Sequence, residues 1–380
     1  MSESRFGWSW KIVALASSLL ASALVLDLLV RLSGVDTPLL WRPHPTLGWV
    51  HIPGARVHWT DEGDGWVRIN NQGMRDIERT TPRQDGVFRI AVFGDSMTEG
   101  VQVNLDQIFT QQLESLLRSE GRRVEVLNFG VSGYSPLQGY LMYREQGVLF
   151  KPDLVLHCVF TDNDVADGVP ELAAGQVGAP FITGLSTSSQ PLKVDYSRAI
   201  EATQDYDREP VRFIREWSAV YRAVGTLRRR VAVLKQAGAN TGSGVPKRYE
   251  LYLASPPKRW AEAWTRLLTI EREFSREAQS RGSMFAIVSV PAGASVDREA
   301  WNALLRKSPA MTTQDWAVDG PNNRLRVIAQ ELGVEIVDPL DLFRARLSSG
   351  PLFFGGFGHF TPAGHKVMAE ALSDWLKGKL

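Results

Sequence analysis

The sequence contains one cysteine, Cys158, in 380 residues. A single cysteine excludes a disulfide within the chain and any zinc site built mainly on thiolates. Strong charge of either sign is also missing, since 43 Lys and Arg against 42 Asp and Glu give a net charge of +1. We therefore expect no nucleic-acid partner. The hydrophobic share of 44% is too high for a disordered chain and fits one large globular domain or two smaller ones.

Charged residues are absent from Ile12 to Leu26, and apolar residues continue to Val30 after an interruption at Asp27. A helix that crosses a bilayer needs about 20 mostly apolar residues. Trp8 and Trp10 precede the run, and tryptophan is typical of the boundary between membrane and water. We therefore expect residues 1–33 to form a single-pass membrane anchor.

The flanking charges predict the orientation of this anchor. Arg5, Lys11 and the amino terminus lie before the apolar run, which by the positive-inside rule places the N-terminus in the cytoplasm and the rest of the chain outside. Two alternatives stay open. The triplet Ala21–Ala23 is consistent with a cleaved signal peptide, and a core helix can also be this apolar.

Residues 34–86 are rich in Pro, Gly, Trp and His, and we interpret them as a lead-in segment of loops and short strands. His44, His51 and His58 are spaced seven apart, which on a helix would place them on one face. The prolines between them exclude that helix, so we predict no metal site here.

From residue 87 onward, short β-branched runs alternate with amphipathic stretches, which predicts a parallel sheet covered by helices on both faces. We expect a three-layer α/β/α sandwich with a five-stranded parallel sheet of the flavodoxin-like kind. The expected strands are 89–93, 124–129, 154–160, 285–290 and 334–337, and the expected helices are 106–120, 259–281, 325–332 and 362–376.

The alternation is broken from about residue 168 to 258, which we interpret as an insertion in the domain over 87–380. Within it, residues 208–236 resemble one long helix, and residues 237–245 resemble a linker. The basic run Arg228–Arg230 has two interpretations: a solvated helix face, or a contact with anionic lipid or polysaccharide.

Polar clusters follow the expected strands, where a parallel sheet gathers its ligand site. Ser96 follows the first strand through a Gly-Asp turn, and a serine needs a base to become a nucleophile. His359, before the last helix, can supply that base. Attack on an ester creates an oxyanion, for which Ser96 and Gly133 offer backbone N–H groups and Asn163 offers its side-chain amide.

Other polar or reactive residues near these clusters have structural interpretations. Asp95 and Asp164 are expected to support their loops through hydrogen bonds, as Asp commonly does in turns. His365 is expected to pack against or cap the final helix. Cys158 lies inside a predicted buried strand and is expected to be inert.

The order Gly94-Asp95-Ser96, Gly133, Asn163-Asp164 and His359 resembles the motif blocks of the SGNH (GDSL) hydrolase superfamily. The resemblance covers residues 87–380 apart from the insertion. It implies that Ser96 is the nucleophile, that His359 is the base, and that Ser96, Gly133 and Asn163 form the oxyanion hole. It implies no metal or organic cofactor.

The segment from Asn70 to Arg75 also resembles a lead-in found in membrane-anchored bacterial members, which are often linked to cell-surface carbohydrate. This resemblance implies a bacterial inner-membrane protein with its catalytic domain on the periplasmic or extracellular side.

The sequence departs from this family at two places. Thr161 replaces the glycine of the third block. In addition, the family usually carries an Asp two or three residues before the catalytic histidine, where this chain has Phe357 and Gly356. Loss of the acid from a triad costs about four orders of magnitude in rate in serine proteases. A backbone carbonyl, Asp338 or Asp341 is left as the group that orients His359.

Three functional hypotheses follow. The first is a membrane-anchored serine esterase that removes a small acyl group, such as acetyl, from a small molecule or a carbohydrate. The second is an O-acyltransferase that passes the same acyl group to a sugar hydroxyl, favoured if the insertion excludes water. The third is a non-catalytic scaffold in a membrane complex, motivated by the missing acid.

Overall fold

A computed structural model describes residues 3–33, 39–173, 178–184, 192–209, 212–228 and 245–380. The chain divides into two compact units, which we describe separately. The larger unit contains residues 40–206 and 242–380, and the smaller contains residues 1–39 and 207–241.

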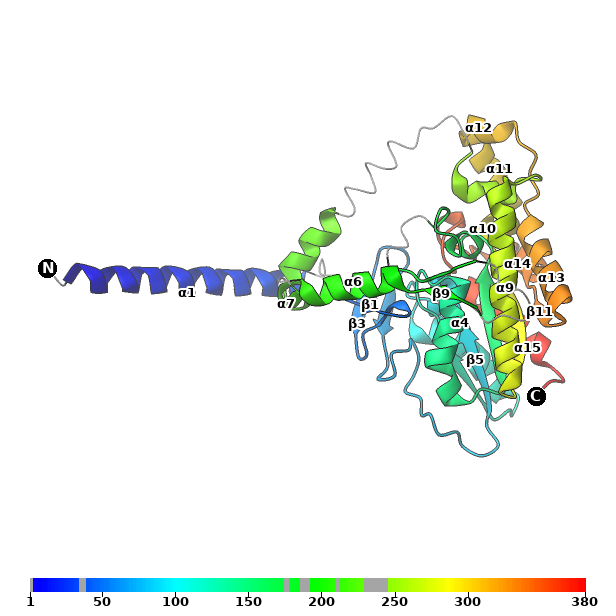
Figure 1. The fold of residues 1–380 in the computed structure, drawn as a ribbon, viewed down its shortest axis with the longest axis horizontal. Helices are drawn as coiled ribbons and strands as arrows, with labels where there is room; N and C mark the ends of the chain where they lie inside the picture. The colour runs from blue at the N-terminus through cyan, green and yellow to red at the C-terminus, as the bar shows by residue number, and fades with distance from the viewer. Residues whose placement is uncertain (1–2, 34–38, 174–177, 185–191, 210–211, 229–244) are drawn as a thin grey trace. The chain divides into compact units, whose positions relative to one another are not determined.

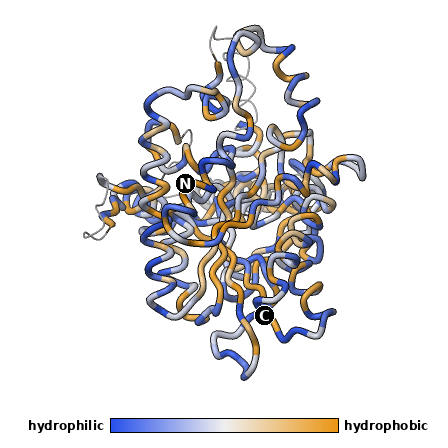
Figure 2. Tube along the Cα trace, turned by 90° about the vertical axis from the view of Figure 1, so that its right-hand side faces the viewer, coloured by the Kyte–Doolittle hydropathy of each residue, from blue (hydrophilic) through white to orange (hydrophobic). Residues whose placement is uncertain are grey.

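A five-stranded parallel sheet forms the centre of the larger unit and confirms the predicted fold class (Figure 1). Its spatial order is β11-β10-β7-β5-β6. The central strands are buried almost throughout because helices cover both faces, and Figure 2 draws them largely in the hydrophobic colour. The strands are β5 (Phe88–Phe93), β6 (Val124–Asn128), β7 (Leu154–Phe160), β10 (Met284–Val290) and β11 (Glu335–Val337).

Two hydrophobic clusters lie on the two faces of this sheet. One includes α3 (Phe109–Ser119), α14 (Leu340–Arg346) and α15 (Pro362–Leu376). The other includes α4 (Pro136–Glu145), α9 (Lys258–Ser280) and α13 (Gly320–Leu332). The four helices expected in the alternating part of the sequence are present as α3, α9, α13 and α15, and α4 is a helix that was not expected. Its residues 136–143 are buried all round, so it lacks the amphipathic period by which helices are recognised.

The remaining elements are short and lie mostly in the lead-in segment and the insertion. They are β1 (Trp41–His44), β2 (Gly48–His51), β3 (Arg56–Trp59), β4 (Gly65–Arg68), α2 (Ser96–Glu99), α5 (Asp164–Asp167), β8 (Phe181–Ile182), β9 (Val194–Asp195), α6 (Ser197–Arg208), α7 (Arg212–Trp217), α10 (Gly293–Val296), α11 (Arg298–Lys307) and α12 (Pro309–Thr312).

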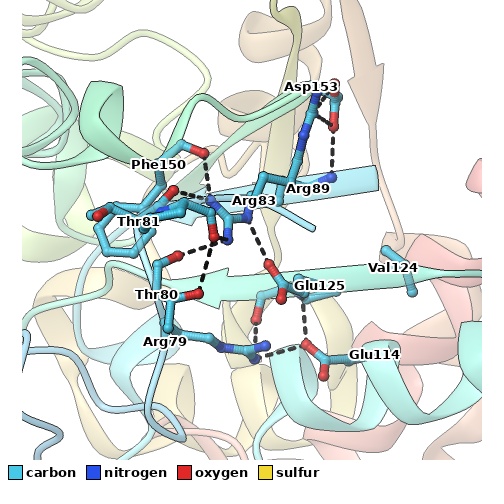
Figure 3. A network of polar contacts seen from close by, with 12 residues as sticks. Arg79, Thr80, Thr81, Arg83, Arg89, Glu114, Val124, Glu125, Phe150 and Asp153 are labelled. Carbon is cyan, nitrogen blue, oxygen red and sulfur yellow. Dashed lines mark hydrogen bonds and ion pairs between the residues drawn. The ribbon is translucent and has the colours of Figure 1, made fainter. Parts of the chain in front are cut away.

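The lead-in segment forms two antiparallel hairpins, β1–β2 and β3–β4, and then joins the sheet through buried arginines (Figure 3). Arg79 donates to Glu114 Oε2 at 2.7 Å and to the carbonyl of Val126 at 2.9 Å. Arg89, on β5, donates to the carbonyl of Thr80 at 2.7 Å. These buried, charge-assisted bonds fix the end of the segment to the beginning of the sheet.

The smaller unit contains α1 (Glu3–Leu32) and part of the insertion. Residues 8–32 of α1 are long and apolar enough to cross a membrane, with a mean hydropathy of 2.3 in the most apolar window. The expectation of one long helix from residue 208 is wrong, because α6 ends at Arg208, α7 ends at Trp217, and a separate helix covers residues 219–228. Most of the expected linker lies outside the described residues.

Candidate active site

Ser96 is the first residue of α2, directly after the turn that ends β5. The Asp95 side chain caps this helix by accepting a hydrogen bond from the N–H of Met97 at 2.9 Å. Gly94 is required for the tight turn, because a Cβ there would lie 2.3 Å from Thr98 Oγ1. The turn leaves the Ser96 residue partly exposed at the carboxyl edge of the sheet.

His359 lies in the loop before α15, and its Nε2 is 2.8 Å from Ser96 Oγ. The carbonyl of His359 accepts a hydrogen bond from the N–H of Phe354 at 2.8 Å, which fixes the backbone of this loop. Thr361 caps α15 two residues later. The expected nucleophile and base are thus within hydrogen-bond distance, with Nε2 placed to accept the serine proton.

Glu62 occupies the position of the missing acid. Its carboxylate is hydrogen-bonded to His359 Nδ1, and its Oε1 accepts the backbone N–H of His359 at 3.1 Å. Partial burial disfavours the charged carboxylate, but the hydrogen bonds and charge of His359 prevail, and the pKa of Glu62 lies below its ordinary value. The chain therefore places Ser96, His359 and Glu62 in one hydrogen-bonded line.

Glu62 comes from the turn of the β3–β4 hairpin, 297 residues away from His359 in sequence. Two glycines permit this approach. A Cβ at Gly358 would lie 1.8 Å from Glu62 Oε1, and a Cβ at Gly63 would lie 2.3 Å from the carbonyl of Gln102. Gly63 also has a φ of +77°, which a side chain would strain. Asp64 N–H bonds to the same Gln102 carbonyl at 3.1 Å and secures the turn against the loop after α2.

Asp338 and Asp341 were left open as alternatives by the sequence, and the structure places Glu62 on His359 Nδ1 instead. Asp338 accepts from the N–H of Leu340 at 3.1 Å and pairs with Arg326 at 2.8 Å. The Asp341 side chain is 90% exposed. A backbone carbonyl is not needed either, since Glu62 holds Nδ1.

The three expected oxyanion donors follow β5, β6 and β7, which are neighbours in the sheet. Gly133 has a φ of +75°, the left-handed conformation that turns its loop. Asn163 donates one Nδ2 proton to Asp167 Oδ2 at 2.7 Å, which leaves its second amide proton for another acceptor. The arrangement brings these groups to the edge where Ser96 lies.

The two supporting aspartates are buried and hydrogen-bonded to backbone. Asp164 accepts the N–H of Phe160 at 2.7 Å, and burial together with the nearby Asp95 charge raises its pKa well above the ordinary value. Burial also raises the pKa of Asp95 to about 6. Both aspartates hold the backbone of loops that carry Ser96 and Asn163.

A second histidine–glutamate pair connects the lead-in segment to the Gly133 loop, and the sequence interpretation missed it. His51 Nε2 lies 2.5 Å from Glu99 Oε1, and both side chains are fully buried. The other oxygen of Glu99 accepts the N–H of Ser132 at 2.6 Å. Glu99 thereby fixes the residue before Gly133. In the sequence, the feature that could have pointed to Glu99 was its position about one helical turn after Ser96.

The insertion reaches the rim of the site through η3 (Lys247–Tyr252). Arg248 pairs with Asp162 at 2.8 Å, and the Tyr252 hydroxyl donates to the other Asp162 oxygen at 2.9 Å. Asp162 directly precedes Asn163, so this part of the insertion supports the loop after β7.

The remaining candidates stay outside this arrangement. His365 is buried against Phe109 and Phe360, and burial lowers its pKa to about 3, so it is neutral. Cys158 is buried in β7, and burial raises its pKa to about 12. No group of three His, Cys, Asp or Glu side chains suited to a metal ion occurs among the residues that the structure describes.

Residues 92–367 match the model of the GDSL-like Lipase/Acylhydrolase family, and the chain belongs to this family. No curated protein matches the chain. Similar solved structures include a lipase/acylhydrolase from Enterococcus faecalis, with 11% identity, 77% of this chain and 97% of that chain covered, and a TM-score of 0.39. An acetylxylan esterase from Geobacillus stearothermophilus has 14% identity, coverages of 78% and 95%, and a TM-score of 0.38.

Proposed function

We propose that this chain is a membrane-anchored serine ester hydrolase that acts through an acyl-enzyme at Ser96. The observation that carries the proposal is the line of hydrogen bonds from Ser96 Oγ to His359 Nε2 and from His359 Nδ1 to Glu62. A nucleophile, a base and a group that orients the base are the parts that acyl transfer requires.

In the proposed reaction, Ser96 Oγ attacks the acyl carbon while His359 Nε2 takes the serine proton. The N–H groups of Ser96 and Gly133 and the amide of Asn163 stabilise the oxyanion of the tetrahedral intermediate. His359 then gives the proton to the leaving alkoxide, and an acyl-serine remains. Water then attacks the acyl-serine while His359 takes a proton from the water. His359 gives this proton to Ser96 Oγ as the acyl–oxygen bond breaks, and the carboxylic acid is released.

Glu62 keeps Nδ1 protonated, so that Nε2 faces the serine as an acceptor. Its negative charge also stabilises the imidazolium that forms in each transition state. This role removes the missing acid as a reason to regard the chain as a non-catalytic scaffold.

We further propose that the substrate is a small acyl ester, such as an acetyl ester on a carbohydrate. We also propose that a single-pass anchor leaves the catalytic domain outside the cytoplasm.

The His359 side chain is 30% exposed among the described residues. Water can therefore reach the base, which favours hydrolysis over transfer to a sugar hydroxyl.

Fluorophosphonate labelling of the full chain tests the proposal, because the probe reacts with activated serines of any substrate specificity. We expect labelling of the wild type and none of Ser96→Ala, with strong loss in His359→Ala. Ser135→Ala is a matched control, because it removes the hydroxyl of a buried serine that is not part of the Ser96–His359–Glu62 hydrogen bonds. Absence of labelling in a folded wild-type protein would overturn the proposal, and acyl transfer to sugars without acid release would replace hydrolysis by transfer.

A further inference from the structure

The smaller unit contains a feature that the proposed hydrolysis does not use: a pair of helices joined to the end of α1. These are α7 and the helix over residues 219–228, which we call the insertion helices. Asp27 accepts hydrogen bonds from Ser218 Oγ at 2.9 Å and from the N–H of Val220 at 3.2 Å. Arg31 pairs with Asp27 at 2.8 Å and also donates to the carbonyl of Trp217.

These bonds explain why an acidic residue interrupts the apolar run of α1. Asp27 caps the second insertion helix by accepting a free N–H of its first turn. It lies five residues before the end of α1 at Leu32, which is about 7 Å along a helix at 1.5 Å per residue. The turn at Ser218 is therefore held at the level where the apolar part of α1 ends.

The insertion helices expose an apolar face at this level. In the second helix, Tyr221, Val224 and Leu227 are spaced three apart and are 40%, 44% and 63% exposed. On α7, Phe213 and Trp217 stack on one another and are 69% and 64% exposed. Soluble proteins rarely leave a contiguous set of large apolar side chains in water.

One arginine of these helices, Arg228, is exposed and suited to an anionic surface, whereas Arg212 and Arg215 are paired with nearby carboxylates. Arg222 is buried and bonds to the carbonyl of Glu216 at 2.6 Å, so the side of the second helix away from its apolar face packs within the unit. The exposed Arg228 closes the described part of this helix and begins the basic run Arg228–Arg230. Apolar and aromatic side chains on one face with arginine nearby are typical of helices that lie in a membrane interface.

We propose that the insertion helices lie in the headgroup region of the membrane that α1 crosses, with Phe213, Trp217 and Leu227 against the acyl chains and Arg228 against lipid phosphates. This inference rests on the proposed membrane anchor. The occupant of the apolar face is the lipid surface, because Asp27 and Arg31 hold the face where the apolar part of α1 ends. Both ends of the segment continue into the larger unit, so the hydrolase is tethered at the membrane through the insertion as well as through α1.

Spin labels test this placement in the full chain, reconstituted in vesicles of three parts phosphatidylcholine to one part phosphatidylglycerol. Labels are attached to Phe213→Cys and Leu227→Cys, with Leu19→Cys on α1 as the lipid reference. Leu149→Cys, 58% exposed in the larger unit, is the water reference. Cys158 is buried, so the wild type gives the background of labelling. The accessibility of each label to oxygen and to a neutral nickel chelate is measured.

For each label we compare the ratio of oxygen accessibility to nickel accessibility. We expect this ratio to be severalfold higher at 213, 227 and 19 than at 149. Nickel-accessible labels at 213 and 227 beside a lipid-exposed label at 19 would overturn the interfacial placement and leave the anchor intact. A water-exposed label at 19 would overturn the anchor and this inference together, while fluorophosphonate labelling of Ser96 reports on the hydrolase separately. Spin–spin broadening at 213 that grows with protein density would assign the face to a second copy and overturn the lipid contact.

Discussion

The lead-in segment and the insertion both interrupt the regular part of the sequence, yet they contribute differently to the candidate site. The lead-in segment supplies Glu62, which contacts His359, and His51, which contacts Glu99 beside the loop that carries Gly133. In the described part of the insertion, Arg248 and Tyr252 contact Asp162 at the rim of the larger unit's candidate site. From this difference we propose that the short lead-in segment serves the chemistry, and that the long insertion serves binding and membrane contact.

Replacement of Glu62 is the strongest test of this division. Glu62→Gln removes the charge that stabilises the imidazolium and permits the wrong tautomer of His359. We expect kcat to fall by about 10³-fold with little change in KM, somewhat less than in serine proteases because the pair is partly exposed. Steady-state kinetics on a chromogenic acetyl ester measure the loss.

Glu78→Gln is the matched control in the same segment, since Glu78 is half-exposed, pairs with Arg68 at 3.3 Å and accepts the N–H of Asn71 at 3.2 Å, away from His359. We expect full activity from it. Equal activity of Glu62→Gln and the wild type would show that Glu62 has a structural role only.

A methyl group at Gly358 tests the same contact from the other side. In Gly358→Ala the new Cβ would lie 1.8 Å from Glu62 Oε1 and 2.6 Å from the carbonyl oxygen of Phe354. We expect the closer contact to displace the hairpin turn and kcat to fall by about 10²-fold. In the double variant with Glu62→Gln, the alanine should cost almost nothing more, because both changes break one interaction.

Gly225→Ala is the control for Gly358→Ala, because nothing lies within 4 Å of a Cβ at this position of the insertion. Its kcat should equal that of the wild type. Additive losses in the double variant of Gly358 and Glu62 would mean that the alanine acts through the loop of His359 and not through the carboxylate.

Substitution of Arg248 tests the part assigned to the insertion. Its side chain is 54% exposed and pairs with Asp162 beside Asn163, so Arg248→Gln should weaken binding at the rim. Loss of a half-exposed charged contact costs about 1 kcal/mol, which is about fivefold in KM, with kcat unchanged. Arg259→Gln, similarly exposed and paired with Glu250, is the control. A large fall in kcat at normal KM would erase the distinction between the two segments.

The smallest expected effect is the contribution of Glu62 to stability as pH changes. The pKa of Glu62 is lower in the folded chain than its ordinary value. Its pairing with His359 therefore stabilises the fold above the ordinary glutamate range and is lost as pH falls through the lowered value. We expect the thermal midpoint of the wild type to exceed that of Glu62→Gln by about 1 °C at pH 6, since solvent screens the pair. The difference should vanish near pH 3; a gap that widens on acidification would contradict the assignment.

Much of the fold was predictable because its elements are long and periodic. β7 and α15 have the bounds that their hydrophobic patterns predict, and the sheet order places Ser96, Gly133 and Asn163 on neighbouring strands. Because the strands could be recognised from their hydrophobic patterns, the polar residues that follow them could be found as well. In contrast, α4 lacked a polar face, and the break at Ser218 depends on a partner in α1.

Glu62 could not be predicted, because no local pattern links a hairpin turn to a loop near the other end of the chain. The signal that existed was indirect: the approach to His359 consists of glycine and phenylalanine, and Gly358 leaves room for a group from elsewhere. Three acidic residues occur in the β3–β4 turn, and their tertiary contacts distinguish them: Asp64 pairs with His58, whereas Glu62 contacts His359.

The origin of Glu62 also affects how such chains are sorted and divided. The match to the family begins at residue 92, so a fragment cut to that boundary would retain the proposed nucleophile and base and discard the proposed acid, Glu62. A search that demands an acid beside the histidine would classify the full chain as a degenerate relative. Imidazole Nδ1 requires only a carboxylate at hydrogen-bond distance, and here a hairpin outside the matched family region supplies it.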